Sequence, residues 1–209
     1  MRCLVTGGAG FIGSNLVDRL IDDSHEVIII DDLSTGQEKN INPKAEFEKF
    51  DISDNEDMWG KIFKDVDVVF HLAAKARVQP SIDNPIEFHN TNVNGTLNVL
   101  KACVDNNVKR FVFSSSSSVY GDVTMLPTPE YQPLNPTSPY ALQKQIGEQY
   151  CKLFSKLYGL ETVCLRYFNV YGDGMDLEST YKLVIPIFTK QIQNGEPMTI
   201  RGDGTQRRD

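Results

Sequence analysis

The sequence has no run of about 18 apolar residues, the shortest length that is typical of a membrane-spanning helix. It also lacks the charged segment and long apolar stretch of a secretion signal at its start. The opening residues, Met1 to Thr6, are typical of a β-strand instead. These absences argue against an integral membrane protein, and they predict a soluble protein of the cytoplasm.

The cysteines, the histidines and the net charge also argue against a disulfide framework, a metal site and the binding of nucleic acids or membrane surfaces. The 4 cysteines form no Cys-x-x-Cys pair, which favours a reduced compartment, and we interpret Cys3 and Cys164 as small core residues. The 3 histidines lack metal-ligand spacing, so no metal site is predicted. The net charge of −7 is unsuited to nucleic acids and membrane surfaces, which attract basic patches.

What the sequence does contain begins with a glycine-rich turn. Gly7, Gly10 and Gly13 follow the apolar residues 3–5, and apolar residues then recur from Phe11 to Leu20 at helical spacing. Strand, glycine turn and helix form the context of a dinucleotide-binding fingerprint, in which the pyrophosphate lies on the helix N-terminus. A plain glycine-rich hairpin is the alternative. We predict cofactor contacts at Gly7, Gly10, Phe11, Ile12 and Gly13.

Acidic residues end the next two predicted strands. Residues 26–30 lead into Asp31 and Asp32, roughly 20 residues beyond the glycines, where a carboxylate accepts hydrogen bonds from a ribose. Such a carboxylate also repels a 2′-phosphate, so NAD is favoured over NADP, with Asp31 as the better candidate. The alternative is an acid that caps a turn. Residues 46–50 form a third predicted strand, and Asp51 and Ile52 after it are expected to line the adenine site.

Strands and helices alternate along the rest of the chain. The apolar run 67–74 is typical of a central parallel strand, and its small Ala73 and Ala74, after Leu72, leave room for a flat cofactor. Asn92 is predicted to contact the cofactor or, alternatively, to be solvated. Further strands are predicted at 110–113, 162–166 and 198–200, and helices at 54–64 with Asp54 as a cap, 86–107, 140–158 and 183–193. The stretch 75–85 is predicted to be a loop, and the helix 140–158 is expected to bury Ile146, Tyr150, Leu153, Phe154 and Leu157. The fold class is α/β, a doubly wound parallel sheet of the Rossmann type with right-handed crossovers.

Two stretches carry candidate chemistry. The serine run from Ser114 to Ser118 follows a buried strand, at the strand end where open α/β sheets bind ligands. Tyr140 and Lys144 lie four residues apart, on one face of a helix that Pro139 can open. An ammonium beside a phenol favours the phenolate, so the pair is suited to proton exchange near neutral pH. A solvated helix face is the alternative for an isolated pair of this kind.

The motifs together resemble a known family. They are Thr6 to Gly13, His71 to Ala74, Asn92 to Thr96, Ser114 to Gly121, Tyr140 to Lys144 and Arg166 to Gly172. In this order they are similar to the extended branch of the short-chain dehydrogenase/reductase superfamily, the NAD-dependent nucleotide-sugar epimerases and dehydratases. Within it, UDP-glucose (UDP-galactose) 4-epimerases are the most similar.

The resemblance implies roles for single residues. Tyr140 would be the acid/base on the sugar's 4-hydroxyl, Lys144 would hold the nicotinamide ribose, and Ser116 would bind the same hydroxyl. Asn169 and Arg208 would contact the diphosphate of a UDP-sugar. Cofactor contacts at Ser114 and Tyr167, a substrate contact at Ser117 and a homodimer are also expected. Dehydratases have Asp-Glu, and decarboxylases Glu, at the positions of Ser117 and Ser118, so both subclasses are disfavoured.

The sequence also departs from the family pattern. Ala76 stands where many 4-epimerases have lysine, and Lys75 and Arg77 flank it in a role that is left open. The resemblance implies an NAD-binding domain at 1–172 and, at 173–209, the beginning of a substrate lobe whose remainder is expected beyond Asp209. Two other functions stay open at this point. One is a nucleotide-sugar reductase or dehydrogenase that releases its cofactor, and the other is a non-catalytic NAD-binding module.

Overall fold

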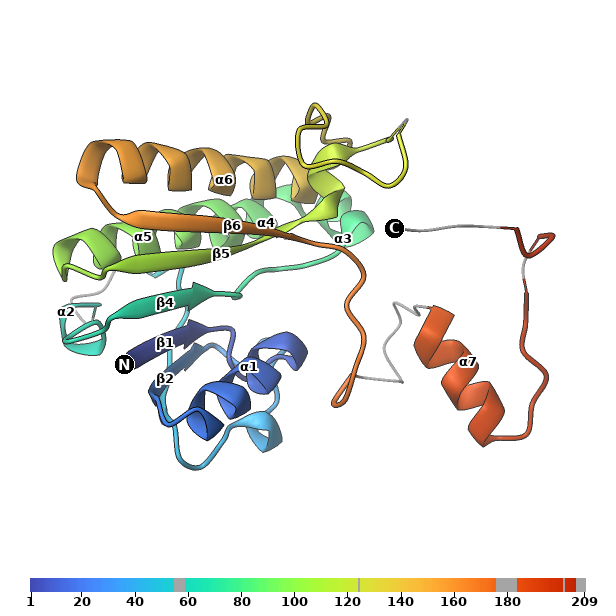
Figure 1. Cartoon of the computed structure of the whole chain (residues 1–209), viewed down its shortest axis with the longest axis horizontal. Coiled ribbons are helices and arrows are strands. Elements are labelled where there is room, and N and C mark those ends of the chain that lie inside the picture. The colour runs from blue at the N-terminus through green and yellow to red at the C-terminus, as the bar shows by residue number, and fades with distance from the viewer. Residues whose placement is uncertain (55–58, 124, 176–183, 201, 206–209) are drawn as a thin grey trace.

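The structure is a computed structural model that describes residues 1–54, 59–123, 125–175, 184–200 and 202–205. Its centre is a six-stranded sheet whose neighbours all pair in parallel, in the order β3-β2-β1-β4-β5-β6 (Figure 1). The order reverses between β1 and β4, and such a switch point is where open α/β sheets bind ligands. The predicted doubly wound Rossmann sheet is confirmed. The strands are β1 (Arg2–Thr6), β2 (Glu26–Asp31), β3 (Glu46–Lys49), β4 (Val68–His71), β5 (Arg110–Ser116) and β6 (Glu161–Tyr167).

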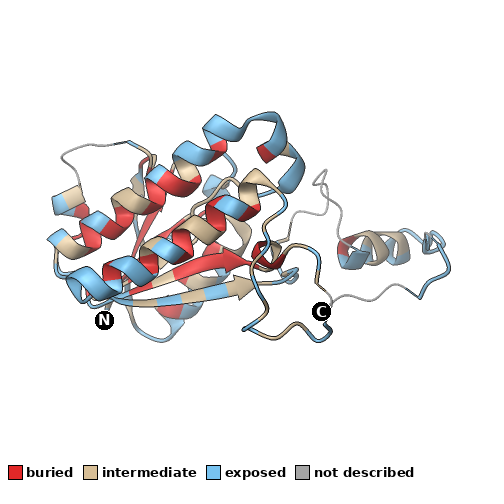
Figure 2. Cartoon of the chain, turned by 90° about the horizontal axis from the view of Figure 1, so that it is seen from above, coloured by how far each residue is buried: buried red, intermediate tan, exposed pale blue. Residues whose placement is uncertain are grey.

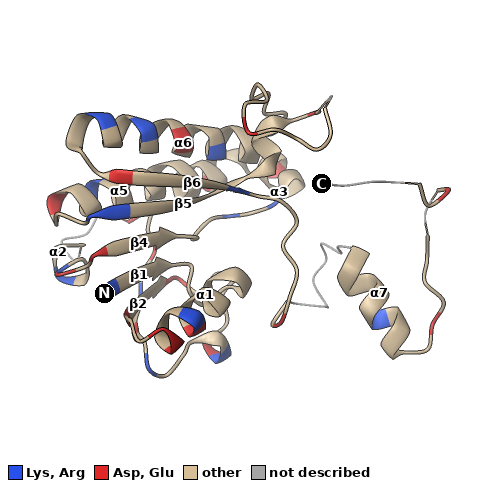
Figure 3. Ribbon diagram, in the orientation of Figure 1, with Lys and Arg blue, Asp and Glu red and all other residues tan. Residues whose placement is uncertain are grey.

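Two apolar cores form because alternate residues of each strand face opposite sides of the sheet. Leu4 of β1 belongs to the larger core, under the helices α5 (Thr96–Asp105) and α6 (Pro139–Tyr158). Its neighbours Cys3 and Val5 belong to the smaller core, which α1 (Phe11–Asp22) covers. Figure 2 shows the buried residues on the inner faces of the helices and along the strands. In Figure 3 the middle of the sheet is largely free of charge, and Lys, Arg, Asp and Glu mark strand ends and helix surfaces.

The shorter elements connect this framework. They are η1 (Glu38–Asn40), α2 (Trp59–Ile62), α3 (Val78–Asp83), α4 (Pro85–His89), the π-helical η2 (Asn90–Gly95), η3 (Ser117–Tyr120) and α7 (Val184–Gln193). Within the described residues, no helix is long and apolar enough to cross a membrane.

Four local predictions need correction. The stretch 75–85, predicted as a loop, contains the helix α3, with Pro80 in its first turn, where the missing N–H does little harm. The predicted helix 86–107 is divided by the π-helical η2. Residues 198–200 form no strand. On α6, Leu153 and Leu157 were expected inside, but both are exposed. The predicted start of the helix after Asp54 lies at residues 55–58, outside the described part of the chain.

Candidate functional site

A cleft of about 550 Å³ lies at the carboxyl ends of the strands, where the strand order reverses. Segments from β1, β2, β4, β5, α6 and the stretch after β6 meet in it. All the predicted site residues except Asn92 and Arg208 line the cleft. They are Gly7, Gly10, Phe11, Ile12, Gly13, Asp31, Asp32, Asp51, Ile52, Leu72, Ala73, Ala74, Ser114, Ser116, Ser117, Tyr140, Lys144, Tyr167 and Asn169. Arg208 lies outside the described residues.

The glycine turn between β1 and α1 leaves its backbone bare on the cleft side. Gly7 has a φ of +72°, a conformation that favours glycine, and a Cβ there would lie 2.7 Å from the backbone nitrogen of Ala73. A Cβ on Gly13 would lie 2.1 Å from the carbonyl oxygen of Gly7. Side chains at these positions would therefore clash with backbone. The turn ends at Gly10, directly before the N-terminus of α1, and so offers a surface suited to a phosphate.

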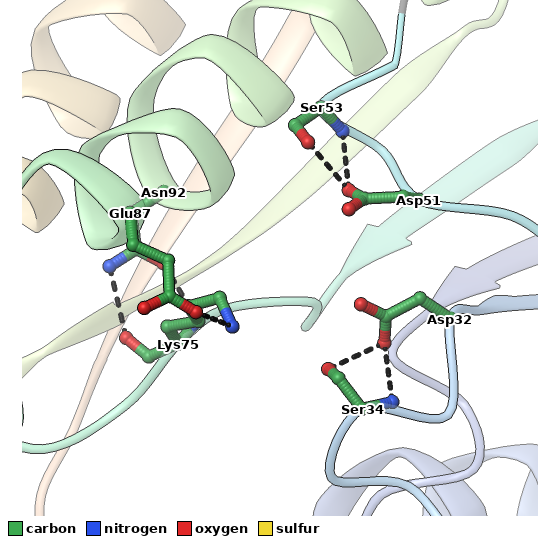
Figure 4. A network of polar contacts seen from close by, with 7 residues as sticks. All are labelled: Asp32, Ser34, Asp51, Ser53, Lys75, Glu87 and Asn92. Atoms are coloured by element: carbon green, nitrogen blue, oxygen red, sulfur yellow. Dashed lines mark hydrogen bonds and ion pairs between the residues drawn. The ribbon is translucent and has the colours of Figure 1, made fainter.

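Carboxylates line the cleft at the ends of β2 and β3. Asp31 accepts hydrogen bonds from the backbone N–H groups of Ala9, at 3.0 Å, and Leu33, at 2.9 Å. Burial raises the pKa of Asp31, and these two hydrogen bonds oppose that shift. Asp32 instead accepts from the backbone and hydroxyl of Ser34 (Figure 4). The geometry therefore distinguishes the two, because Asp31 is tied to the glycine turn and Asp32 to its own turn.

Asp51 faces the cleft from the end of β3. Its carboxylate accepts hydrogen bonds from the backbone N–H and hydroxyl of Ser53, both at 2.8 Å. Figure 4 shows Asp32 and Asp51 on one side and Lys75 with Glu87 on the other. The Lys75 ammonium lies 2.7 Å from a Glu87 carboxylate oxygen. Lys75, Ala76 and Arg77 all line the cleft, so acidic groups stand at the β2–β3 end and basic groups at the β4 end.

Asn92 is not among the residues that line the cleft, although its neighbour Thr91 is. Its side-chain oxygen accepts from the backbone N–H of Lys75 at 2.9 Å, and its amide group donates to the Lys75 carbonyl at 3.0 Å. The amide also donates to Gln143 of α6 at 2.9 Å. The side chain is buried, so the alternative of a solvated asparagine is wrong, and the contact with the cofactor stays a prediction. Asn92 fixes the loop after β4 against α6.

Tyr140 and Lys144 lie at the N-terminal end of α6, and both line the cleft. The Lys144 ammonium is buried, donates a hydrogen bond to the Ser114 carbonyl at 2.8 Å and lies 5.0 Å from the centre of the Phe113 ring. Burial lowers the pKa of Lys144 to about 8. The lysine is thus fixed to the end of β5, and Tyr140 precedes it by one turn of the same helix. This is the pairing that the sequence predicts.

The serine run is not a linker, because β5 continues through Ser116. The Ser116 hydroxyl accepts from the backbone N–H of Ser118 and so caps η3. The hydroxyl of Ser114 is buried without a hydrogen-bond partner among the described residues. Buried polar groups in native proteins usually have a partner, so this orphan hydroxyl at the cleft is compatible with a ligand group beside it.

Sequence reasoning missed a buried histidine that joins β1, β4 and α5. His71 Nδ1 lies 2.8 Å from the hydroxyl of Thr6, which also accepts from the Ala73 N–H. His71 Nε2 lies 3.0 Å from the hydroxyl of Thr96, which donates to the Asn92 carbonyl. These partners suit a neutral ring protonated on Nε2, and burial lowers the pKa of His71 to about 3. A polar residue inside the apolar run 67–74 was the available signal.

The residues present fit a dinucleotide. A side chain at Gly7 or Gly13 would clash with backbone, so the glycine turn stays free of side chains there. Asp31 lines the cleft at the end of β2, where a ribose would lie, and the small residues Ala73 and Ala74 line it after β4. Tyr140 and Lys144 line the same cleft from α6. This arrangement can hold a nicotinamide cofactor and place a phenol with a neighbouring cation against a second ligand.

Comparisons with known proteins agree with this geometry. Residues 3–209 match the model of the NAD dependent epimerase/dehydratase family. A putative UDP-glucose 4-epimerase of Methanocaldococcus jannaschii is 48% identical over 99% of this chain and 68% of its own length. UDP-glucuronic acid decarboxylase 1 of Danio rerio is 35% identical over 99% of this chain and 50% of its own length.

A similar solved structure is the UDP-N-acetylglucosamine 4-epimerase of Methanobrevibacter ruminantium M1 in complex with UDP-N-acetylmuramic acid. It is 46% identical, with a TM-score of 0.90, and the match covers 98% of this chain and 66% of the other. The chain therefore spans about two thirds of the length of the epimerases that it matches here.

Proposed function

Because this chain belongs to the NAD dependent epimerase/dehydratase family, we propose that it is a nucleotide-sugar 4-epimerase with tightly held NAD. Its substrate would be a UDP-hexose of the glucose/galactose type. The observation that carries the proposal is the position of Tyr140 and Lys144 on α6, facing the same cleft as the bare glycine turn, with Lys144 anchored on Ser114. The named relatives act on UDP-sugars, which supports the substrate class.

The chemistry of the chain's own residues is proton transfer at the sugar's 4-hydroxyl. NAD, when bound, supplies a reversible acceptor for the hydride at carbon 4. The Tyr140 phenolate takes the hydroxyl proton and, since epimerisation restores the hydroxyl, returns it at the end. The Lys144 ammonium favours the phenolate by its charge. The Ser116 hydroxyl, at the end of β5, would hydrogen-bond the same sugar oxygen.

The residues after Ser116 support epimerisation over the family's other reactions. Ser117 and Ser118 stand where the resemblance places the extra acid and base of dehydratases and the glutamate of decarboxylases, and both serines line the cleft. A serine hydroxyl is too weak an acid and base for those steps. The same proposal assigns Asn169 to the sugar-nucleotide diphosphate, and it assigns residues 1–172 to the NAD-binding domain.

The deciding experiment compares Tyr140→Phe with the unchanged chain. The variant should retain NAD and lose epimerase activity on UDP-galactose by roughly 100-fold or more, the usual contribution of acid–base catalysis. Tyr131→Phe is the matched control, because Tyr131 is 81% exposed and lies outside the cleft. Full activity of Tyr140→Phe would refute the proposed role of the phenol.

An ultraviolet spectrum before and after UDP-galactose addition separates the other functions. A bound cofactor that is partly reduced on adding sugar supports the epimerase. Protein purified without cofactor, with turnover only when stoichiometric nicotinamide cofactor is supplied, would indicate a reductase or dehydrogenase. Bound NAD without reduction would indicate a non-catalytic NAD-binding module.

A further inference from the structure

The first turn of α6, which carries Tyr140, is held partly from outside its own helix. Pro139 has no N–H, and the hydroxyl of Ser138 accepts the N–H of Ala141 at 3.2 Å as the N-cap. The carbonyl of Ser138 accepts the N–H of Leu142. The backbone N–H of Tyr140 donates to a residue of another helix, the hydroxyl of Ser81 in α3, at 3.1 Å. The proposed acid/base residue is therefore tied by its main chain to α3.

The hydroxyl of Ser81 links the start of α3 to the start of α6 by two hydrogen bonds. Its side chain is fully buried, and its hydroxyl donates to the carbonyl of Val78 at 2.6 Å while it accepts from Tyr140. Val78 is the first residue of α3 and lines the cleft together with Arg77. One hydroxyl thus joins the cleft-lining start of α3 to the backbone of Tyr140. The short helix that the sequence did not predict is the element that makes this connection.

We propose that Ser81 is a positioning residue for Tyr140, holding the first turn of α6 so that the phenol stays at the cleft beside Lys144. This inference rests on the proposed function, because it takes the Tyr140 phenol as the group that exchanges protons. Lys144 has its own anchor, the carbonyl of Ser114. Loss of the Ser81 hydroxyl would leave Lys144 on its anchor and remove one of the ties that hold the Tyr140 end of the turn. The separation between phenol and ammonium would then change.

The test is Ser81→Ala, with Ser81→Cys as a second variant that keeps the volume of the buried side chain. The kcat for UDP-galactose should fall about tenfold or more with KM within about twofold, because misplacement of a reacting group by about an ångström is enough for such a loss. A thiol is a weaker hydrogen-bonding group than a hydroxyl, so the kcat of Ser81→Cys should lie between those of wild type and Ser81→Ala. A second readout needs no turnover.

That second readout is the pH titration of the Tyr140 phenol, followed as the ultraviolet difference between each protein and its Tyr140→Phe counterpart. In Ser81→Ala the pKa of the phenol should rise by about one unit, because the phenolate is held less closely to the Lys144 ammonium. The control is Thr162→Val, which also removes a hydroxyl that bonds the α6 backbone, at the Cys151 carbonyl, far from the phenol. Its kcat and its phenol pKa should match those of wild type.

The outcomes are separable. If the wild-type chain converts no UDP-sugar, the proposed function fails, and the phenol titration still decides the role of Ser81. If Ser81→Ala keeps both the wild-type phenol pKa and, where activity is present, the wild-type kcat, the inference is overturned. Equal changes in Ser81→Ala and Thr162→Val would also overturn it, because they would show a general effect of loosening α6.

Discussion

The ammonium of Lys144 and the carbonyl of Ser114 are joined by a 2.8 Å hydrogen bond inside the interface between α6 and β5. A charged lysine is thereby kept in an almost completely buried position, with one backbone carbonyl and the Phe113 ring among its neighbours. Burial of this charge destabilises the fold at neutral pH. Such a cost is typical of functional sites, where a group is kept for its chemistry.

This burial predicts an unusual pH dependence of stability. The pKa of Lys144 is lowered to about 8 in the folded chain, against roughly 10.4 for an unperturbed lysine, so the unfolded state binds more protons between these values. The free energy of unfolding should therefore rise with pH through this window, by about 2 kcal/mol between roughly pH 7 and pH 9.5. Urea unfolding at the two pH values measures it. Lys144→Met should lose this increment, and an equal increment in that variant would contradict the assignment.

Asp31 is predicted to decide between NAD and NADP. In Asp31→Asn the affinity for NAD should fall about tenfold, because a charged acceptor for the ribose hydroxyls becomes neutral. Discrimination against NADP should fall with it, since the repulsion of the 2′-phosphate is removed. Titration calorimetry with each cofactor measures both effects. Asp32→Asn is the control, because the Asp32 carboxylate is turned to Ser34, and equal effects of the two variants would contradict the prediction.

Glu148 and Arg166 should be strongly coupled. The guanidinium of Arg166 in β6 binds the nearly buried Glu148 carboxylate of α6 in a bidentate manner, at 2.9 and 2.8 Å, and also donates to the Tyr120 hydroxyl. Glu148→Leu alone should cost about 3–5 kcal/mol of unfolding free energy, because it leaves Arg166 without its counter-charge. The double variant Glu148→Leu, Arg166→Met should be more stable than Glu148→Leu alone. A double variant whose losses simply add would show that the pair is not coupled.

The exposed face of α6 predicts self-association. Leu142, Leu153 and Leu157 are 48%, 45% and 60% exposed on this helix, and apolar side chains arranged in this way favour a helix-to-helix contact. We propose that a homodimer forms across this face. Leu153→Glu should shift sedimentation velocity towards the monomer. Leu126→Glu, an equally drastic change at another exposed leucine, should leave the assembly unchanged, and a monomeric wild-type chain would contradict the proposal.

The parts of the site that the sequence predicts are those encoded by local spacing. Gly7, Gly10 and Gly13 lie between a strand and a helix, and Tyr140 and Lys144 are separated by one helical turn, so these groups could be placed without tertiary information. The parallel, doubly wound sheet follows from the alternation of strands and helices along the chain. Asp31 is also predicted by local sequence, because its place at the end of a strand follows from the apolar pattern before it.

What the sequence does not predict depends on contacts between distant segments. Asn92 binds Lys75 and Gln143, and neither partner can be read from the neighbours of Asn92 in the chain. Ser81 lies in a short helix without apolar periodicity, and its hydrogen bond to Tyr140 spans two helices. Apolar spacing along α6 predicts that Leu153 and Leu157 face the core, but both are exposed. The spacing does not reveal whether an apolar residue packs on the sheet or lies on the outer surface of the helix.

The π-helical segment η2 makes this region sensitive to chain length as well as to residue type. It runs from Asn90 to Gly95 between α4 and α5, and it includes Asn92. A wider turn accommodates one additional residue while the helices on either side keep their relative orientation. Removing one residue here would let ordinary α-helical winding resume, so α4 and α5 would stay close to their present orientation. Asn92 and Thr96 now bond to Lys75 and His71, which lie in β4 or in the loop after it, and in the shortened stretch they could not both keep these places. A single deletion would therefore loosen the β4 side of the cleft.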